Sequence, residues 1–238
     1  MIRLRKQLKE LHSSHSFLSD FILGSQDGLV NVLGILLGVS AATSNVTIIF
    51  VAALAALGAE SISMGAVAYT STVARRRQYL KEGSREEKEM KDVPLTERKE
   101  VRDILEGWGY QDEELDSMTE HIVANPKAMF EFMMSFELRL APVSKSEPRR
   151  SFAVVLSSTI FGSIIPLIPF LFVTAATIHS GIVESVFLSG AVLFFVGAYE
   201  ARTTVGSLWT SGLQMAIIGL SAGFAGYLIG HFVGAVPV

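Results

Sequence analysis

Five segments of the sequence are apolar over about 20 residues, the length that an α-helix needs to cross the hydrocarbon core of a bilayer. They lie at residues 19–43, 46–72, 152–178, 182–201 and 211–235. We therefore predict an all-α fold, a polytopic membrane protein with five transmembrane helices. Pro166 and Pro169 fall inside the third segment and remove backbone donors, which predicts a kink or a break in this helix.

Charged residues are concentrated between the second and third apolar segments. Residues 75–150 hold 15 of the 20 Lys and Arg residues and 17 of the 23 Asp and Glu residues. We predict transmembrane helices one and two within residues 1–74, a polar insert at 75–150, and helices three to five within 151–238. The net charge of −3 shows no basic excess that would favour nucleic acid. Membrane lipid is the expected surrounding, and no nucleic acid partner is expected.

The distribution of Lys and Arg predicts the orientation, because cytoplasmic loops carry an excess of these residues. Basic residues precede the first span (Arg3, Arg5, Lys6, Lys9) and flank the insert (Arg75, Arg76, Arg77, Arg149, Arg150). The loops between spans one and two and between spans three and four carry none, nor does the C-terminal tail. We expect a cytoplasmic N-terminus and insert and an external C-terminus. The basic start shows no signal-peptide pattern, which favours the plasma membrane of a prokaryote.

Two carboxylates lie well inside the apolar segments, away from the segment ends. Asp27 is in span one and Glu60 is in span two. A charged group at this depth costs about 2.5–3.5 kcal/mol or more, so it normally faces a bundle interior or a wet cavity. Alternatively, Asp27 reaches the interface from a helix end, and Glu60 is an interhelical hydrogen-bonding partner. Met64 follows Glu60 by four residues on one helix face, where its thioether is either a soft metal ligand or a packing residue.

Span one contains two pairs of glycines at GxxxG spacing. They are Gly24 with Gly28 and Gly34 with Gly38. Glycines at this spacing let two helices approach closely. We predict a helix–helix seam along span one, either within the chain or between subunits.

The insert is predicted to consist of short helices separated by breakers. The tail of span two runs to about Met90, and further helices cover about 96–106, 112–124 and 127–140. Pro94 cannot continue the helical tail of span two, and Thr96 is expected to cap the helix over about 96–106.

Acidic residues of the insert are spaced so that they share helix faces. Glu86 with Glu89 and Glu97 with Glu100 are three residues apart, and Met133 and Met134 precede Glu137 by four and three. Such oxygen-rich groups suit Mn²⁺, Mg²⁺, Ca²⁺ and, with softer neighbours, Fe²⁺. With no Cys and no Glu-x-x-His motif, zinc and ferroxidase chemistry are not expected. The alternative is that these are ordinary solvated faces, and that His121 is solvated too.

Several stretches, taken together and in order, resemble the vacuolar iron transporters and their prokaryotic relatives. They are SQDGLVNVLGILLGVSAA in span one, SISMGAVAY in span two, EEKEMKDVPLTERKEV and FMMSFEL in the insert, and GSIIPLIPF in span three. The resemblance covers nearly the whole chain, with the insert in the same place. It implies a homodimer that moves Fe²⁺, and often Mn²⁺, out of the cytosol in exchange for protons.

The same resemblance implies roles for single residues. Asp27 would be the intramembrane carboxylate on the ion path, and Met64 its methionine partner. The ligands of a cytoplasmic metal-binding domain would be Glu86, Glu89, Glu97, Glu100, Met133, Met134 and Glu137. One position departs from the family pattern, since many relatives carry a Glu four residues after this Met, where Ala68 stands here. The second carboxylate of the path is then supplied by Glu60 or by nothing.

We therefore expect a dimeric exporter of Fe²⁺ and Mn²⁺ that works by proton antiport. Its partners would be divalent metal ions and protons, with no cofactor beyond the transported metal. The alternative is a membrane-anchored protein that binds or senses metal without transport. An enzyme is not expected, because HExxH and paired intramembrane aspartates are absent from the sequence and its histidines are scattered.

Overall fold

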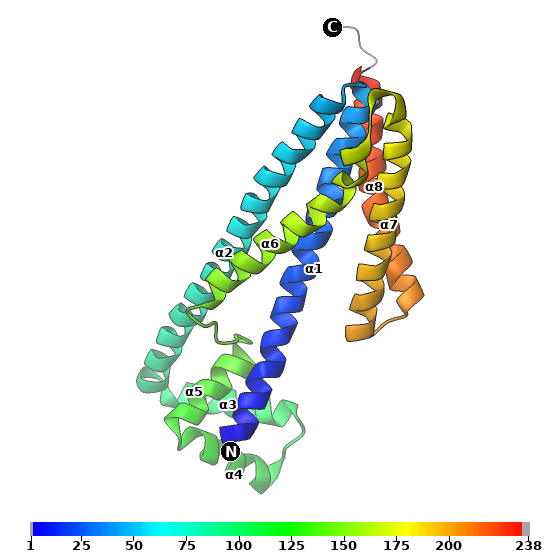
Figure 1. Ribbon diagram of the computed structural model, residues 1–238. Helices are drawn as coiled ribbons and strands as arrows, with labels where there is room; N and C mark the ends of the chain where they lie inside the picture. Colours follow the sequence, from blue (N-terminus) through cyan, green and yellow to red (C-terminus); the bar gives the residue numbers. More distant parts are fainter. Residues whose placement is uncertain (1, 235–238) are drawn as a thin grey trace. The chain divides into compact units, whose positions relative to one another are not determined.

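The computed structural model describes the backbone of residues 2–234 and the side chains of residues 17–234 except residue 175 (Figure 1). The described chain is helical, and five helices are long and apolar enough to cross a membrane. These are α1 (Ile2–Ala42), α2 (Val46–Asp92), α6 (Glu147–Leu167), α7 (Ile178–Thr203) and α8 (Leu208–Gly234). The predicted all-α class and the five spans are confirmed.

The chain divides into two compact units. The membrane unit comprises Met1–Tyr69 and Arg149–Val238, and the insert unit comprises Thr70–Pro148. Helix α2 continues from one unit into the other. Its 47 residues correspond to about 70 Å, more than twice the roughly 30 Å of a hydrocarbon core. The charged part of α2, from Arg75 onwards, therefore lies outside the membrane-spanning segment.

The membrane unit has one apolar core, to which α1 contributes most. The fully buried members are Val32, Leu33, Leu36, Leu37, Ile49, Ala53, Leu167, Phe170 and Ile178. They come from α1, α2, the end of α6, the segment after it and the start of α7. Helix α8 lies along both α1 and α7 (Figure 1).

Both glycine pairs of α1 pack against other helices of the same chain. A Cβ on Gly38 would lie 2.9 Å from the Gly226 carbonyl oxygen of α8, and one on Gly230 would overlap the Gly38 carbonyl oxygen. Gly24 and Gly28 meet hydroxyl-bearing residues of α6 in the same way. The predicted helix–helix seam is therefore present within the chain.

Substitution of glycine by alanine is expected to have opposite effects at Gly230, inside the α1–α8 seam, and at Gly58, outside it. Gly230→Ala forces the two backbones apart, and overpacking of this kind costs about 1–3 kcal/mol. Gly58 of α2 has no atom within 4 Å of an added Cβ, so Gly58→Ala is expected to stabilise by about 0.5–1 kcal/mol through helix propensity. Thermal unfolding of the detergent-solubilised protein measures both changes. Equal melting temperatures for the two variants would contradict the tight seam.

The third span ends earlier than predicted. Helix α6 stops at Leu167, and two short 3₁₀ turns, η2 (Pro169–Phe172) and η3 (Ala175–Thr177), lead into α7. The predicted kink or break at Pro166 and Pro169 is confirmed, and the α-helix stops before the predicted end of the span at residue 178 because each proline lacks a backbone N–H donor. The Ser185 hydroxyl of α7 donates to the Pro166 carbonyl at 2.8 Å, which replaces one of the lost partners.

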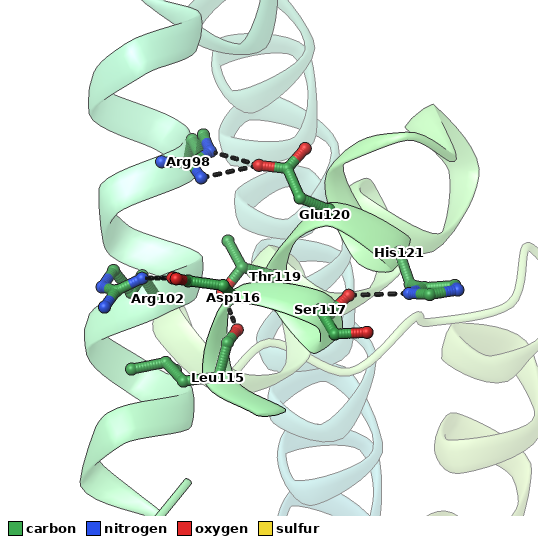
Figure 2. Close-up of polar contacts among 8 residues, drawn as sticks. All are labelled: Arg98, Arg102, Leu115, Asp116, Ser117, Thr119, Glu120 and His121. Atoms are coloured by element: carbon green, nitrogen blue, oxygen red, sulfur yellow. Dashed lines mark hydrogen bonds and ion pairs between the residues drawn. The ribbon is translucent and has the colours of Figure 1, made fainter. Parts of the chain in front are cut away.

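The insert unit contains the charged end of α2 and three further helices, α3 (Pro94–Gly107), α4 (Asp112–Val123) and α5 (Pro126–Phe132). Their core consists of Val101, Leu105, Leu115, Met129, Phe132 and Met133. Two ion pairs, Arg98 with Glu120 and Arg102 with Asp116, join α3 to α4 beside this core (Figure 2). Both pairs are largely exposed to solvent, so each contributes at most about 1 kcal/mol.

Two details of the insert differ from prediction. Helix α3 begins at Pro94 with Val93 as its N-cap and without a side-chain cap, so the expected cap at Thr96 is wrong. Proline is favoured at the first helical position because its missing N–H is not needed there. The helix predicted over 127–140 is α-helical only to Phe132 and continues as a π-helical turn, η1 (Met133–Glu137).

Candidate functional site

The membrane unit brings two carboxyl groups together. Asp27 lies on α1 and Glu60 on α2, and each carboxyl group interacts directly with the other. The Asn31 amide, one turn after Asp27 on α1, also faces Glu60. Both acidic residues are partly buried, so Glu60 is an interhelical partner and Asp27 does not simply reach for the interface. Glu60 was expected either to face the interior of the helix bundle or to be an interhelical hydrogen-bonding partner. Its contact with Asp27 meets both descriptions.

An open groove of about 1050 Å³ runs past this pair. Its walls come mainly from α1 and α8 and are almost entirely apolar. Asp27 and Asn31 are two of its few polar lining residues, with Thr43 near the end of α1. A polar ion therefore finds oxygen ligands in this groove only at a few places, and the largest group is at Asp27.

Two carboxyl groups in contact at membrane depth cannot both remain bare anions. Like charges at this separation repel strongly, and the surroundings screen them poorly. Either a proton or a cation must lie between them. Asp27 Oδ2 is buried and has no hydrogen-bond partner among the described residues, so it is available to such a species. The pair is chemically suited to exchange a cation for a proton.

Helix α2 carries the two remaining residues of interest one and two turns beyond Glu60. Met64 is partly buried on the same helix face, and Ala68 is buried with 9% of its surface exposed. At the position of Ala68 there is no polar side chain, so the carboxyl partner of Asp27 is Glu60. The soft thioether of Met64 lies one turn from that partner.

The insert unit gathers a second and larger acidic group. Glu86 of α2 and Glu97 of α3 are each only 3% exposed and interact directly with each other. One oxygen of each carboxyl group, Glu86 Oε1 and Glu97 Oε2, is buried without a hydrogen-bond partner among the described side chains. Burial raises the pKa of Glu86 to about 8, with further contributions from Glu97, Glu137 and Glu89. At neutral pH the folded insert therefore holds a proton here.

Three more predicted ligands surround this buried pair. Burial, and then the charges of Glu97 and Glu89, raise the pKa of Glu100. Burial, and then the charges of Glu100, Glu97 and Glu89, raise the pKa of Glu137. Glu89 is held by Arg85, whose Nε lies 3.0 Å from Glu89 Oε1. All five glutamates predicted from the sequence thus belong to one electrostatic cluster, defined here as the acidic cluster.

The two methionines lie beside the acidic cluster in different surroundings. Met133 is fully buried and belongs to the apolar core of the insert. Met134 is also buried, and its terminal methyl group lies near Gly83 of α2. Both start the π-helical turn, in which the Leu138 N–H donates to the Met133 carbonyl at 3.0 Å. Single π-turns are frequent at functional sites because they reorient side chains within a helix.

The side chains of the acidic cluster are not arranged as a metal coordination shell in the described structure. Among the side chains that the structure describes, no three of His, Asp or Glu already converge on one point at coordinating distance. Divalent ions bound by carboxylates need several oxygens within about 2.0–2.6 Å, so binding requires these side chains to rotate toward one another. His121 does not take part, since it is exposed and its Nδ1 lies 2.7 Å from the Ser117 carbonyl oxygen (Figure 2).

Two residues of these sites, Asn31 and Arg85, were not predicted from the sequence. Asn31 follows Asp27 by four residues, a spacing that places both on one face of α1. Arg85 precedes Glu89 by four residues, the spacing of a helical ion pair. Both signals were present, but a lone amide or arginine at such a spacing is common and does not by itself indicate a site.

Comparison with known proteins finds similarity along nearly the whole chain. The profile of the VIT family matches residues 18–231. A protein named vacuolar iron transporter 2, from Oryza sativa subsp. japonica, is 35% identical over 211 residues, which cover 87% of this chain and 84% of that protein. Vacuolar iron transporter 1 of Eucalyptus grandis is 31% identical over 226 residues, covering 94% and 90%. The vacuolar iron transporter of Plasmodium falciparum (isolate 3D7) is 30% identical over 221 residues, covering 90% and 81%. These matches include both the membrane helices and the insert.

Proposed function

The chain belongs to the VIT family and is an iron transporter of that family, and we propose that it exports Fe²⁺, and also Mn²⁺, from the cytosol in exchange for protons. The observation that carries this proposal is the Asp27–Glu60 carboxyl pair beside an open groove in the membrane unit. A protein that only anchors a metal-binding domain has no use for such a pair.

The acidic cluster would collect the metal on the cytoplasmic side. Its five glutamates repel one another, and the raised pKa values of Glu86, Glu100 and Glu137 express this repulsion together with burial. A divalent cation relieves the repulsion by displacing the proton, so metal binding and proton release are linked. Oxygen ligands favour Mn²⁺ and Fe²⁺ over softer ions, while Met133 and Met134 would add soft character for Fe²⁺.

The Asp27–Glu60 pair would be the second station. A cation that reaches the pair replaces its proton, and a proton replaces the cation once the ion has left. The pair carries a single negative charge with one proton and is neutral with a divalent cation, so each ligand lowers the cost of keeping two acidic groups at membrane depth. Met64, one turn from Glu60, would give the cation a soft neighbour on its way.

The assembly and location complete the proposal. The groove beside Asp27 is open along α1 and α8, and in a homodimer a second copy would close it. The Lys and Arg distribution supports a cytoplasmic N-terminus and insert and an external C-terminus.

Reconstitution into liposomes tests the function directly. Fe²⁺ or Mn²⁺ uptake is followed with a trapped metal-sensitive dye and proton movement with a trapped pH dye. We expect metal flux that accelerates with an opposing proton gradient and proton flux that requires metal. Metal bound by the protein without any flux would favour a metal-sensing membrane protein, and metal flux without proton movement would remove antiport from the proposal.

A further inference from the structure

Asn31 is a polar residue within span one that the proposed carboxyl pair does not account for. Four residues after Asp27, it lies on the same face of α1 and lines the same groove. An amide at membrane depth is costly unless it finds a partner. Most of the groove lining around it is apolar, so the partner must come from the neighbouring acidic residues or from a ligand.

Glu60 supplies one partner. Its carboxyl group faces both Asp27 and the Asn31 side chain. An amide has two N–H donors and one carbonyl oxygen with two lone pairs. Since a carboxylate only accepts, the Asn31 amide group must use an N–H toward Glu60. The Asn31 Oδ1 atom is not used in this contact, and its side chain belongs to the lining of the groove.

We propose that Asn31 is a specificity-determining ligand of the membrane station: one N–H orients Glu60, and Oδ1 is a neutral third oxygen for the divalent cation between Asp27 and Glu60. This inference rests on the proposed function. Two carboxylates balance the charge of a divalent cation, and a neutral third ligand adds coordination without adding charge. Affinity for hard divalent cations rises with the number of charged ligands, so a third carboxylate would hold the ion too tightly for rapid release.

The proposal makes two substitutions at one position act in opposite directions. Asn31→Leu removes the third oxygen, and the loss of one such contact is expected to raise the KM for Mn²⁺ about tenfold. Asn31→Asp replaces the neutral oxygen by a charged one, which lowers both KM and kcat because the ion binds more tightly and leaves more slowly. KM and kcat of both variants are measured as Mn²⁺ flux in proteoliposomes. Equal amounts of protein are used, and only protein that elutes like the wild type in gel filtration is reconstituted. Ser40→Ala is the matched control and should leave KM unchanged, because Ser40 lies on the same helix, its hydroxyl donates to the Leu36 carbonyl, and it does not line the groove.

A purely structural asparagine predicts a different result. Both substitutions would then disturb Glu60 in the same way, and KM would rise in both variants or in neither; either outcome overturns the inference. Asp27→Ala, measured in parallel, separates this failure from that of the proposed path. If Asp27→Ala is inactive while the Asn31 variants behave alike, only the role of Asn31 is wrong. If Asp27→Ala transports normally, the membrane station itself is wrong.

Discussion

Replacement of Asp27 by alanine is expected to abolish Fe²⁺ and Mn²⁺ flux through the reconstituted protein while leaving the fold intact. The substitution removes one of the two carboxyl groups that face each other in the membrane unit. Loss of a charged partner at a buried site costs about 3 kcal/mol or more, equivalent to at least about a 100-fold loss of ion affinity. Glu60 alone would not balance the charge of a divalent cation.

The matched control is Asp20→Ala, seven residues earlier on the same helix. Asp20 accepts a hydrogen bond from the Ser151 hydroxyl at 2.8 Å and does not line the groove. This variant loses the same charge but should retain most of the flux. Asp27→Glu keeps the charge while shifting its position, and should retain a fraction of the rate. Wild-type transport by Asp27→Ala would remove the carboxyl pair from the ion path.

The second large effect concerns the pH dependence of the insert. The Glu86 pKa is raised to about 8 in the folded protein, above the ordinary value of about 4.3 in an unfolded chain. Between these two values the folded state binds a proton that the unfolded state has lost. Stability from this group is therefore fully present below about pH 4.3 and is lost progressively up to about pH 8, at about 1.4 kcal/mol per pH unit.

The two tryptophans of the chain allow this change to be measured in the full-length protein. Trp108 lies in the insert unit and packs on Phe132 and Phe136, whereas Trp209 lies in the membrane unit. In a Trp209→Phe background, Trp108 fluorescence follows denaturant unfolding of the insert alone. We expect the metal-free insert to be less stable at pH 9 than at pH 6, and Mn²⁺ to restore its stability at pH 9.

Glu86→Gln should remove both effects. Glutamine is isosteric with the protonated carboxyl group, so the variant should be insensitive to pH in this range and should gain little stability from Mn²⁺. Glu87→Gln is the control, since Glu87 is the next residue on the same helix but is exposed. A pH profile that is the same in Glu86→Gln as in wild type would show that another group binds the proton.

The fold could be predicted largely because lipid allows few alternatives. Apolar segments of about 20 residues must be helical in a bilayer, and each of the described helices α1, α2, α6, α7 and α8 contains most of one such segment. The end of α6 could not be placed from composition, because residues 168–178 are apolar whether or not they are helical. Only the two prolines indicated the break, and its position depends on the Ser185 hydrogen bond from another helix.

The candidate sites were predictable as residue types but not as geometry. Spacing placed Glu86 with Glu89 and Glu97 with Glu100 on shared helix faces. That Glu86 and Glu97 meet across two helices and are both buried depends on tertiary packing. Likewise, the contact of Glu60 with Asp27 joins two helices, and no pattern within either helix specifies it. The choice between Glu60 and no partner at all was therefore left open by the sequence.

The π-helical turn at Met133–Glu137 has a consequence for how this sequence tolerates change in length. A π-turn holds one residue more than an α-helix of the same register, since its hydrogen bonds run from residue i to i+5. Deletion of one residue within the turn can therefore be absorbed by conversion to α-helix, with the flanking segments left in register. Alignments of this chain with proteins that lack the turn should place a single-residue gap here. The carboxylate at Glu137 would then point in a different direction in proteins whose sequences otherwise match.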